Sequence, residues 1–505
     1  MGGMTRQRRL VASVGAFATL ATIVAVGCGD DDATTKPASD AGSDTSQPDV
    51  QQPGDDAGND VSGNDGGANA GQPQPKLVPI SLTGHDRFFG VTFDAAGNIY
   101  VTGVTSATTA PTDDWQSFVA KFTPAGALDT TFGPNADGIA RVNLAVGTNG
   151  EVTRAIVVQS TGKIVIAGEA EHPAAADARD RDIYLARFNA NGTIDTTFGP
   201  NGDGIAPFDL SGGEVSGPAY SRDTSWGLNL LAGDKLLFTG AIKRTGATDL
   251  DWAIVRTDAN GALDATWAGT GVFTLDIGNF GASPRNATVL ADGSVVGTGY
   301  YTDTTDPVNP VVKPVMFKVD PTGVLSTTFA GGVGYYTEAV QALQAEVYGA
   351  ASQGTSFVTA GYGRDTGSTN DWISLRIKAD GTRDMTYGTN GKAVIDPAGA
   401  GFNDNARAVA VMPDDRVLLI GGARPTATKS IATLWMLTKD GQPDLTFGAK
   451  GLRTYDLGGV GDFFWASAIS PDKKKLVIVG LYGAAPNAGA GNTDDDGAML
   501  ILPLP

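Results

Sequence analysis

Cysteine and histidine are almost absent from this chain of 505 residues, which has one cysteine, Cys28, and two histidines, His85 and His172. A single cysteine cannot form an internal disulfide or a cysteine-rich metal site. Two histidines are too few for a multi-histidine zinc or iron centre. No Gly-x-Ser-x-Gly motif occurs, and no Ser-His-Asp set can be assembled. The sequence therefore predicts no catalytic residue, no cofactor and no metal site.

Basic residues are also scarce, because 36 Lys and Arg stand against 55 Asp and Glu, which gives a net charge of −19. The charge is +3 for residues 1–27, −9 for residues 29–75 and −13 for the rest of the chain. An acidic body repels nucleic acids and anionic membrane surfaces, so we predict no nucleic-acid partner. Long stretches without glycine are rare as well, since 69 residues are glycine. This composition favours many short strands joined by turns.

The N-terminal segment has the features of a secretory signal. Three arginines precede the apolar stretch of residues 10–26, and the sequence VAVGC closes it. This closing sequence resembles a bacterial lipobox, in which Gly27 precedes the cleaved bond and Cys28 becomes the lipidated first residue. The resemblance implies a lipid anchor on Cys28 and an outer-membrane lipoprotein of the bacterial cell envelope, facing the periplasm or the cell surface. The alternative is an ordinary signal peptide with a chance cysteine.

Residues 29–75 contain almost nothing to bury, because they consist mainly of Asp, Gly, Ser, Asn, Gln, Pro and Ala. Low hydrophobicity and like charge predict that such a segment is disordered. We therefore divide the chain into a signal peptide (residues 1–27), a disordered Asp/Gly/Pro-rich tether (residues 28–75) and a folded body (residues 76–505).

One phrase occurs six times in the folded body. In residues 189–204 it reads NANGTIDTTFGPNGDG, and the other copies repeat its glycine and aromatic positions. A repeat of about 60 residues indicates a stacked or circular array of similar units. The first glycines of the six copies are Gly126, Gly192, Gly261, Gly323, Gly381 and Gly441.

The sequence pattern of each unit predicts four short strands, because apolar runs alternate with turn residues. In the second unit these strands are residues 154–159, 163–168, 182–188 and 204–210. A glycine that ends the second strand occurs seven times, which is once more than the phrase. These glycines are Gly103, Gly168, Gly240, Gly299, Gly361, Gly421 and Gly480.

The two ends of the body complement one another. The seventh unit predicts strands at residues 463–469, 475–480 and 498–502, and the sequence then ends without the phrase or a fourth strand. Residues 76–82, KLVPISL, are similar to the fourth strands GIARVNL and GIAPFDL. We therefore predict an all-β, seven-bladed β-propeller with four-stranded blades, closed by an N-terminal strand that completes the last blade. An open solenoid is the alternative architecture.

The phrase itself has a structural interpretation. Its Asn-Gly or Asp-Gly pair suits a turn with positive φ, and its aspartate can accept a hydrogen bond from the backbone N–H two residues later. The aromatic residue of each copy is expected to pack between neighbouring blades. One copy has Ser326 in place of the aspartate, which a turn tolerates and a ligand site does not. Near-identical polar turns of this kind indicate scaffold rather than an active site.

The repeat pattern resembles the delta-60 repeat family of bacterial propeller proteins. The matching features in the second unit are Thr161-Gly162-Lys163 at the first turn, the acid-led strand of residues 182–188, and Ile194-Asp195-Thr196-Thr197-Phe198-Gly199. The resemblance extends over residues 76–505, and its six linked copies make it specific. It implies a secreted or surface β-propeller, and it implies no established reaction.

Three arginines are weak candidates for ligand binding. Arg154, Arg285 and Arg407 fall at the beginning of the predicted innermost strand, a place that Trp226 and Glu346 take in other units. Strands nearest the axis line the central channel, so these arginines can converge on a small anionic ligand. Salt bridges between blades are the alternative, and the one that the sequence favours.

Acidic residues precede several third strands, which places them on one rim of the array. A calcium or other cation site is one interpretation, and solvated loops that cap the strands are the favoured one. Both histidines are expected in exposed loops. The acidic residues are Asp113, Asp114, Asp249, Asp251, Asp371 and Asp494 to Asp496.

These features lead to a functional interpretation. We expect a membrane-anchored, extracytoplasmic and monomeric β-propeller. It is expected to act as a binding or scaffold module for an unknown protein or glycan ligand and not as an enzyme. The alternative is a hydrolase or lyase that acts on a saccharide or another small substrate, with acidic residues at the propeller axis.

Overall fold

The computed structural model describes residues 84–108, 115–145, 151–171, 181–212, 223–244, 247, 249–367, 369–399, 401–483 and 495–504, and the backbone of residues 76–78, 180, 221 and 222. All of them lie in the unit Lys36–Pro505. The regular elements of these residues are strands, apart from two short 3-10 segments, η1 (Ala232–Asp234) and η2 (Phe329–Gly332). The all-β prediction is confirmed. The predicted signal segment, Cys28 and the tether lie outside the described residues.

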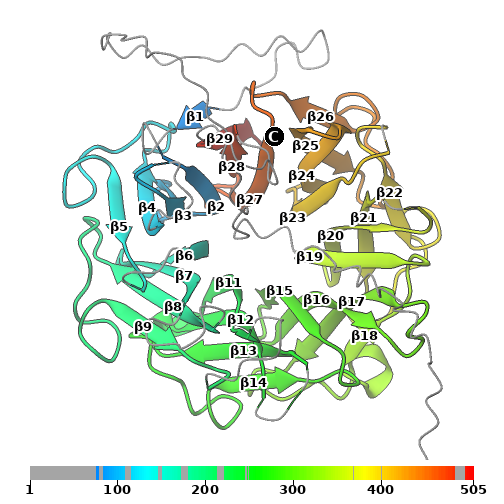
Figure 1. Cartoon of the computed structure of the whole chain (residues 1–505), viewed down its shortest axis with the longest axis horizontal. Helices are drawn as coiled ribbons and strands as arrows, with labels where there is room; N and C mark the ends of the chain where they lie inside the picture. The colour runs from blue at the N-terminus through cyan, green and yellow to red at the C-terminus, as the bar shows by residue number, and fades with distance from the viewer. Residues whose placement is uncertain are drawn as a thin grey trace, which may run out of the picture. The chain divides into compact units, whose positions relative to one another are not determined.

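The strands form antiparallel sheets that follow one another around a common centre, with the first strand of each group innermost (Figure 1). The first sheet has β2 (Asp86–Phe93), β3 (Ile99–Thr105), β4 (Gln116–Phe122) and β5 (Ile139–Val142). The second has β6 (Val152–Val158), β7 (Ile164–Glu171), β8 (Asp180–Phe188) and β9 (Ile205–Phe208), and β10 (Ser221–Arg222) pairs in parallel with β8. The third has β11 (Ser225–Leu230), β12 (Leu236–Ile242), β13 (Asp251–Thr257) and β14 (Val272–Leu275).

The next sheet has eight strands because a single parallel pair, Val312 and Gln344, joins two four-stranded groups. One group is β15 (Ala282–Val289), β16 (Val295–Asp303), β17 (Val311–Val319) and β18 (Tyr335–Thr337). The other is β19 (Gln344–Gln353), β20 (Ser356–Arg364), β21 (Asp371–Ile377) and β22 (Lys392–Ile395). The four-stranded sheet that follows has β23 (Asn405–Val411), β24 (Val417–Thr426), β25 (Lys429–Leu437) and β26 (Leu452–Tyr455).

The last sheet combines both ends of the folded body. Its order is β1 (Lys76–Val78), β29 (Asp496–Pro503), β28 (Lys475–Tyr482) and β27 (Phe463–Ile469). β1 runs antiparallel to β29, and Leu77 lies opposite Ala498. The predicted N-terminal strand thus occupies the first three residues of the predicted segment, 76–82, whose other residues lie outside the described ones.

The strands start and end close to the predicted residues, with one systematic difference. The seven repeated glycines lie inside their strands, because the ladder to the third strand continues beyond them. In β7, for example, Gly168 pairs with Tyr184, and the pairing then runs on to Glu171 and Arg181. The prediction that these glycines end their strands is therefore wrong.

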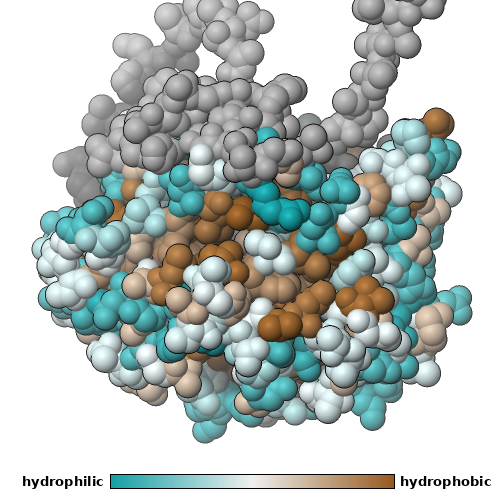
Figure 2. All heavy atoms as spheres, turned by 90° about the horizontal axis from the view of Figure 1, so that it is seen from below, coloured by the Kyte–Doolittle hydropathy of each residue, from teal (hydrophilic) through white to brown (hydrophobic). Residues whose placement is uncertain are grey.

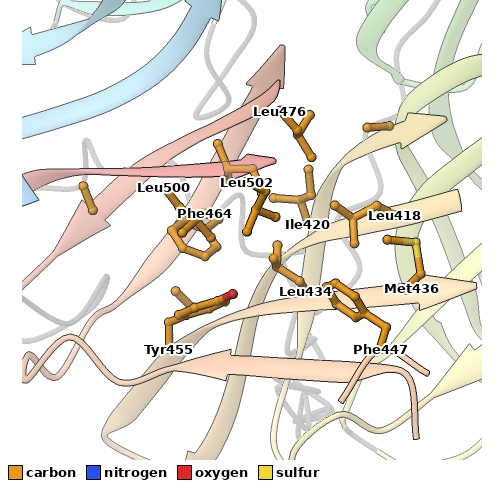
Figure 3. Packing of buried hydrophobic residues seen from close by; sticks show 14 of the residues in the cluster. Leu418, Ile420, Leu434, Met436, Phe447, Tyr455, Phe464, Leu476, Leu500 and Leu502 are labelled. Atoms are coloured by element: carbon orange, nitrogen blue, oxygen red, sulfur yellow. The ribbon is translucent and has the colours of Figure 1, made fainter. Parts of the chain in front are cut away.

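The hydrophobic core lies between facing sheets. Figure 3 shows one such layer, in which Leu418 and Ile420 of β24 and Leu434 of β25 face Leu476 of β28 and Leu500 of β29. Each of these side chains is completely buried. Burial of one such side chain contributes about 1.5–3 kcal/mol to folding, so these layers hold neighbouring sheets together.

The phrase turns act as predicted. At Asp195, the Oδ1 atom accepts hydrogen bonds from the Thr197 N–H (3.1 Å) and hydroxyl (2.7 Å), and the other oxygen contacts Lys163 and Arg187 at 2.7 Å each. Asp129, Asp264, Asp384 and Asp444 accept the same backbone bond. Ser326 makes longer bonds, because its Oγ atom accepts the N–H groups of Thr328 and Phe329 at 3.3 Å each.

The phrases are also linked in series. Phe198 is buried and packs against Gly261 of the next phrase. A Cβ atom added to Gly261 would lie only 2.8 Å from the Phe198 ring. The next residue, Gly199, donates its N–H to the Asn260 carbonyl. The same backbone bond joins Gly133 to Asn191, Ala268 to Thr322, Ala330 to Asp380 and Gly388 to Asp440. The prediction that the aromatic residues pack between units is confirmed.

Neighbouring groups contact one another through their innermost strands. In chain order these strands are β2, β6, β11, β15, β19, β23 and β27; each contacts the next, and β27 contacts β2. At right angles to this view, hydrophobic residues gather in the middle of one side of the molecule and hydrophilic residues surround them (Figure 2). Within the described residues there is no helix with the length and apolar character needed to cross a membrane.

Candidate active site at the axis

Each innermost strand carries one β-bulge at the same position. In β15, for example, Pro284 pairs with Gly299 and Asn286 pairs with Thr298, so Arg285 is left out of the ladder. A bulge turns its side chain out of the alternation of the strand, and bulges are frequent next to active sites. The seven bulged residues are Phe89, Arg154, Trp226, Arg285, Tyr348, Arg407 and Trp465.

The seven repeated glycines make these bulges possible. A Cβ atom on Gly299 would lie 2.2 Å from the Ser283 carbonyl oxygen, which belongs to the residue two before the bulge. The corresponding distances are 1.8 Å for Gly361 and 2.0 Å for Gly421. No side chain larger than hydrogen fits at such an approach, so glycine is required here by close contact and not by positive φ.

The bulged residues line one cavity at the axis. Its volume is about 400 Å³, and its lining continues from the bulges along all seven innermost strands. Half-buried polar side chains, Asn229, Thr288 and Ser467, lie further along the same strands. A cavity of this size accommodates a small ligand or one sugar residue.

Arginines and aromatic rings alternate around this cavity. The Trp226 ring lies between the guanidinium groups of Arg154 and Arg285, each 4.3 Å from the ring centre. The Tyr348 ring lies between Arg285 at 4.4 Å and Arg407 at 4.1 Å. These cation–π contacts stabilise the three guanidinium groups inside the protein.

Trp465 and Phe89 continue the ring. The Arg407 guanidinium lies 5.1 Å from the Trp465 ring centre. Phe89 and Trp465 form an edge-to-face pair with 5.1 Å between their ring centres. We call the seven bulged residues the axial ring.

Phenol groups stand next to the arginines. Arg285 Nη2 donates to Tyr300 Oη at 2.6 Å and to Tyr348 Oη at 3.1 Å, and Tyr348 Oη lies 3.1 Å from Tyr362 Oη. Burial, followed by the charge of Glu346, raises the pKa of Tyr362 well above its usual value. Tyr362 therefore stays protonated, and the three phenols form a connected network beside the cavity.

The sequence analysis placed one residue of this site wrongly. It aligned Glu346 with the arginines, whereas Tyr348 holds that position and Glu346 lies two residues earlier, where it is buried. Burial raises the pKa of Glu346, and the charge of Arg285 opposes this shift. The cavity lining contains three arginines and no acid, so the expectation of acidic residues at the axis is also wrong.

The three predicted arginines do converge on one cavity. Arg154 forms an ion pair with Glu169 at 3.4 Å, but Glu169 belongs to β7 of the same sheet. The alternative of salt bridges between sheets therefore does not describe this pair. Sequence reasoning did not find Phe89, Tyr348 or Trp465, although the repeated glycines mark all seven bulges.

The rim at the start of the third strands is acidic, as predicted. Oxygen atoms of Asp249, Asp251 and Asp276 lie within 4.8 Å of one another, as do those of Asp182, Asp209 and Asp223. Arg244 forms ion pairs with Asp251 and Asp276, so a basic side chain partly offsets the charge of the first cluster. Asp371 and Asp496 begin β21 and β29. Asp113, Asp114 and Asp494 lie outside the described residues.

Buried carboxylates precede several innermost strands and hold the preceding loops. Glu151 accepts the N–H groups of Ala145 (3.0 Å) and Ser117 (3.1 Å), and Asp223 accepts that of Ser211 (3.0 Å). Burial raises the pKa of Glu151, of Asp223 and of Asp404 to about 7 each, and that of Asp462 to about 6. These side chains are structural anchors of loops and do not line the axial cavity.

His85 is buried and not exposed, which corrects the prediction for this histidine. Its ring pairs with Asp495 and stacks on Trp115 at 5.5 Å, and Arg87 Nε contacts the same carboxylate at 2.5 Å. Asp495 comes from the last sheet, so this cluster joins the first sheet to the last. His172 lies outside the described residues.

Comparisons with known proteins support a propeller repeat. The family described as "Domain of unknown function (DUF5122) beta-propeller" matches residues 159–198, from the first turn of the second sheet to the aromatic residue of its phrase. No curated protein matches the chain.

Several solved structures resemble this fold at low sequence identity. Polysaccharide lyase Uly1 is 10% identical with a TM-score of 0.43, and the alignment covers 83% of this chain and 90% of that one. A polysaccharide lyase of family PL25, an ulvan lyase bound to -[GlcA(1-4)Rha3S]-, is 9% identical with a TM-score of 0.42, and covers 86% and 95%. The α-L-arabinanase of Penicillium chrysogenum is 11% identical with a TM-score of 0.38, and covers 68% and 91%.

These names correct the functional interpretation. All three are saccharide-acting enzymes by name, and none is a scaffold protein. They contradict the main interpretation, a binding or scaffold module, and leave the preference for a protein that is not an enzyme without support.

Proposed function

We propose that the protein is an enzyme that cleaves a saccharide, and that the axial cavity holds the sugar residue at the cleaved bond. The observation that carries this proposal is the axial ring around a cavity of about 400 Å³. Trp465 offers an aromatic ring on which the C–H face of a sugar packs, and Asn229 and Ser467 offer polar groups for its hydroxyls.

The proposal is tested by product release. The protein beginning at Lys76 is incubated with neutral and uronate-containing polysaccharides, and reducing ends and the ultraviolet absorbance of unsaturated sugars are measured. Hydrolysis releases reducing ends alone, whereas elimination also creates the unsaturated sugar. We expect Trp465→Ala to abolish release, while Phe280→Ala, an aromatic change outside the cavity, leaves it intact. Absence of products from every polysaccharide contradicts the proposal.

We further propose a seven-bladed propeller that is closed by β1. Seven innermost strands with the same bulge, the cyclic order of their contacts and the β1–β29 pairing support this. Removing β1 exposes the edge of β29 and invites association through it. A variant that begins at Thr83 is therefore expected to unfold at a lower temperature than one that begins at Lys76. Equal stability, with both variants monomeric, argues against closure by this strand.

The lipid anchor is a proposal as well, supported by the VAVGC sequence alone. We expect Cys28→Ser to leave the protein unprocessed or released from membranes, because lipid chains on this residue supply the apolar attachment. Membrane fractionation and the mass of the mature protein measure both effects. Unchanged partition and processing in the variant count against an anchor at Cys28.

A further inference from the structure

The axial ring concentrates positive charge in an acidic protein. The body from residue 76 onward carries a net charge of −13, yet three of the seven ring positions are arginine. Arg285 and Arg407 are buried, with exposed fractions of 6% and 9%. Burying guanidinium groups costs free energy unless they are stacked, hydrogen-bonded or paired with an anion.

The stacking geometry orients these arginines. Tyr348 lies between Arg285 and Arg407, and its ring centre is 4.4 Å from the first guanidinium group and 4.1 Å from the second. Their edges carry the hydrogen-bond donors, and the cavity lining includes both residues. Two guanidinium groups at one small cavity fit an oxyanion, which accepts several charge-assisted hydrogen bonds.

An aromatic ring beside the arginines fits the rest of such a ligand. Trp465 lines the cavity, and its ring centre lies 5.1 Å from the Arg407 guanidinium group. A free inorganic anion makes no use of this ring, whereas a sugar that carries an anionic group uses both chemistries.

We propose that the axial ring recognises an acidic sugar, whose carboxylate or sulfate group binds Arg285 and Arg407 while its ring packs on Trp465. This inference rests on the proposed saccharide-cleaving function and specifies its substrate class. The oxyanion is the shared chemistry of uronic acids and sugar sulfates. Neutral saccharides are expected to bind weakly at this site.

Calorimetry with four probes tests the proposal on the protein beginning at Lys76: glucuronate, glucose 6-sulfate, glucose and inorganic phosphate. We expect one or both acidic sugars to bind roughly tenfold or more tightly than glucose and phosphate, and added salt to weaken this binding. Tight binding of phosphate contradicts the role of the sugar ring. Equal binding of glucose contradicts the role of the anion.

Variants assign the binding to the ring. Arg285→Met and Arg407→Met are each expected to weaken acidic-sugar binding roughly tenfold or more, because each removes charge-assisted hydrogen bonds. Arg285→Lys keeps the charge and is expected to fall between Arg285→Met and the unchanged protein. Arg141→Met, which breaks the half-exposed pair with Asp137, is the matched control and should bind normally. Normal binding by Arg285→Met and Arg407→Met, with unchanged unfolding temperatures, overturns the proposal.

The outcomes separate this inference from the function on which it rests. Cleavage of neutral polysaccharides alone keeps the saccharide-cleaving function and overturns the acidic substrate. Binding of acidic sugars without cleavage of any polysaccharide confirms the recognition and overturns the enzyme.

Discussion

The axial ring and the phrase turns both recur in successive repeats of the chain, but the phrase turns repeat their side chains and the axial ring repeats its backbone geometry. The phrase turns preserve side chains, since an aspartate binds the N–H two residues later in five of the six copies. The axial ring preserves only a backbone geometry, in which a glycine lies opposite a β-bulge. The residue at the bulge is arginine, tryptophan, tyrosine or phenylalanine. Repeated side chains indicate scaffold, whereas a repeated backbone with varied side chains indicates a binding site.

The strongest test of this comparison is a glycine of the bulge. Gly299→Ala places a Cβ atom 2.2 Å from the Ser283 carbonyl oxygen, so the strand pair must separate. We expect a loss of more than about 4 kcal/mol in the free energy of unfolding. Denaturant unfolding measures it, and Gly281→Ala, where no atom lies within 4 Å of the added methyl group, is the control. A small effect at Gly299 means that the bulge is not held by close contact.

A phrase aspartate is expected to have the next largest effect. Asp195→Ala removes the bonds to Thr197 and leaves buried Arg187 without its carboxylate, for an expected loss of about 3 kcal/mol. Ser326→Ala, at the position without an aspartate, is expected to cost less than about 0.5 kcal/mol, because its bonds are long and exposed. Equal losses in thermal unfolding of the two variants contradict the structural role of the aspartate.

The aspartates of the phrase turns and those that precede the innermost strands are expected to have opposite effects on stability as the pH changes. Hydrogen bonds from Lys235 and then Thr266 lower the pKa of Asp264 in the phrase, so its stabilisation is present above its ordinary pKa and is lost on acidification. Burial raises the pKa of Asp404 to about 7, so its contribution is present below its ordinary pKa and is lost as the pH rises through about 7. We therefore expect maximum stability in weak acid and a decline toward weak base.

Asp404→Asn isolates the second effect. Asp404 Oδ1 accepts the Arg424 N–H, and the amide oxygen of asparagine can accept the same bond. The variant is expected to lose roughly 1–2 kcal/mol of the stability difference between about pH 5 and pH 8. Asp414→Asn, at an exposed turn, is the control. An unchanged pH profile in Asp404→Asn means that this carboxylate is already charged in weak acid.

The sequence predicted the scaffold well and the site only in part. Turn residues and strands follow from short-range pattern, so the phrase, β27 and the β1–β29 pairing were found at nearly the right residues. A bulge has no such short-range pattern in the sequence, because its extra residue shifts the alternation of side chains between the two faces of the strand by one. The turn between β19 and β20 is also short, with Gln353 opposite Ser356, so Tyr348 lies 13 residues before its glycine, whereas each predicted arginine lies 14 residues before its own.

The links between phrases all point in one direction, from a donor in one repeat to a carbonyl in the next. A head-to-tail contact of this kind has no natural end, and identical units joined by it form either a ring or an unlimited filament. Repeat number is therefore free to change by duplication without any new contact being invented. In the last sheet, β28 begins with Lys475, whose ammonium group donates to the Pro124 carbonyl of the first phrase at 2.7 Å. Arg187 and Arg376 reach the corresponding carbonyls of Ala259 and Lys439, so the last sheet contacts the first phrase through a side chain as other sheets contact theirs.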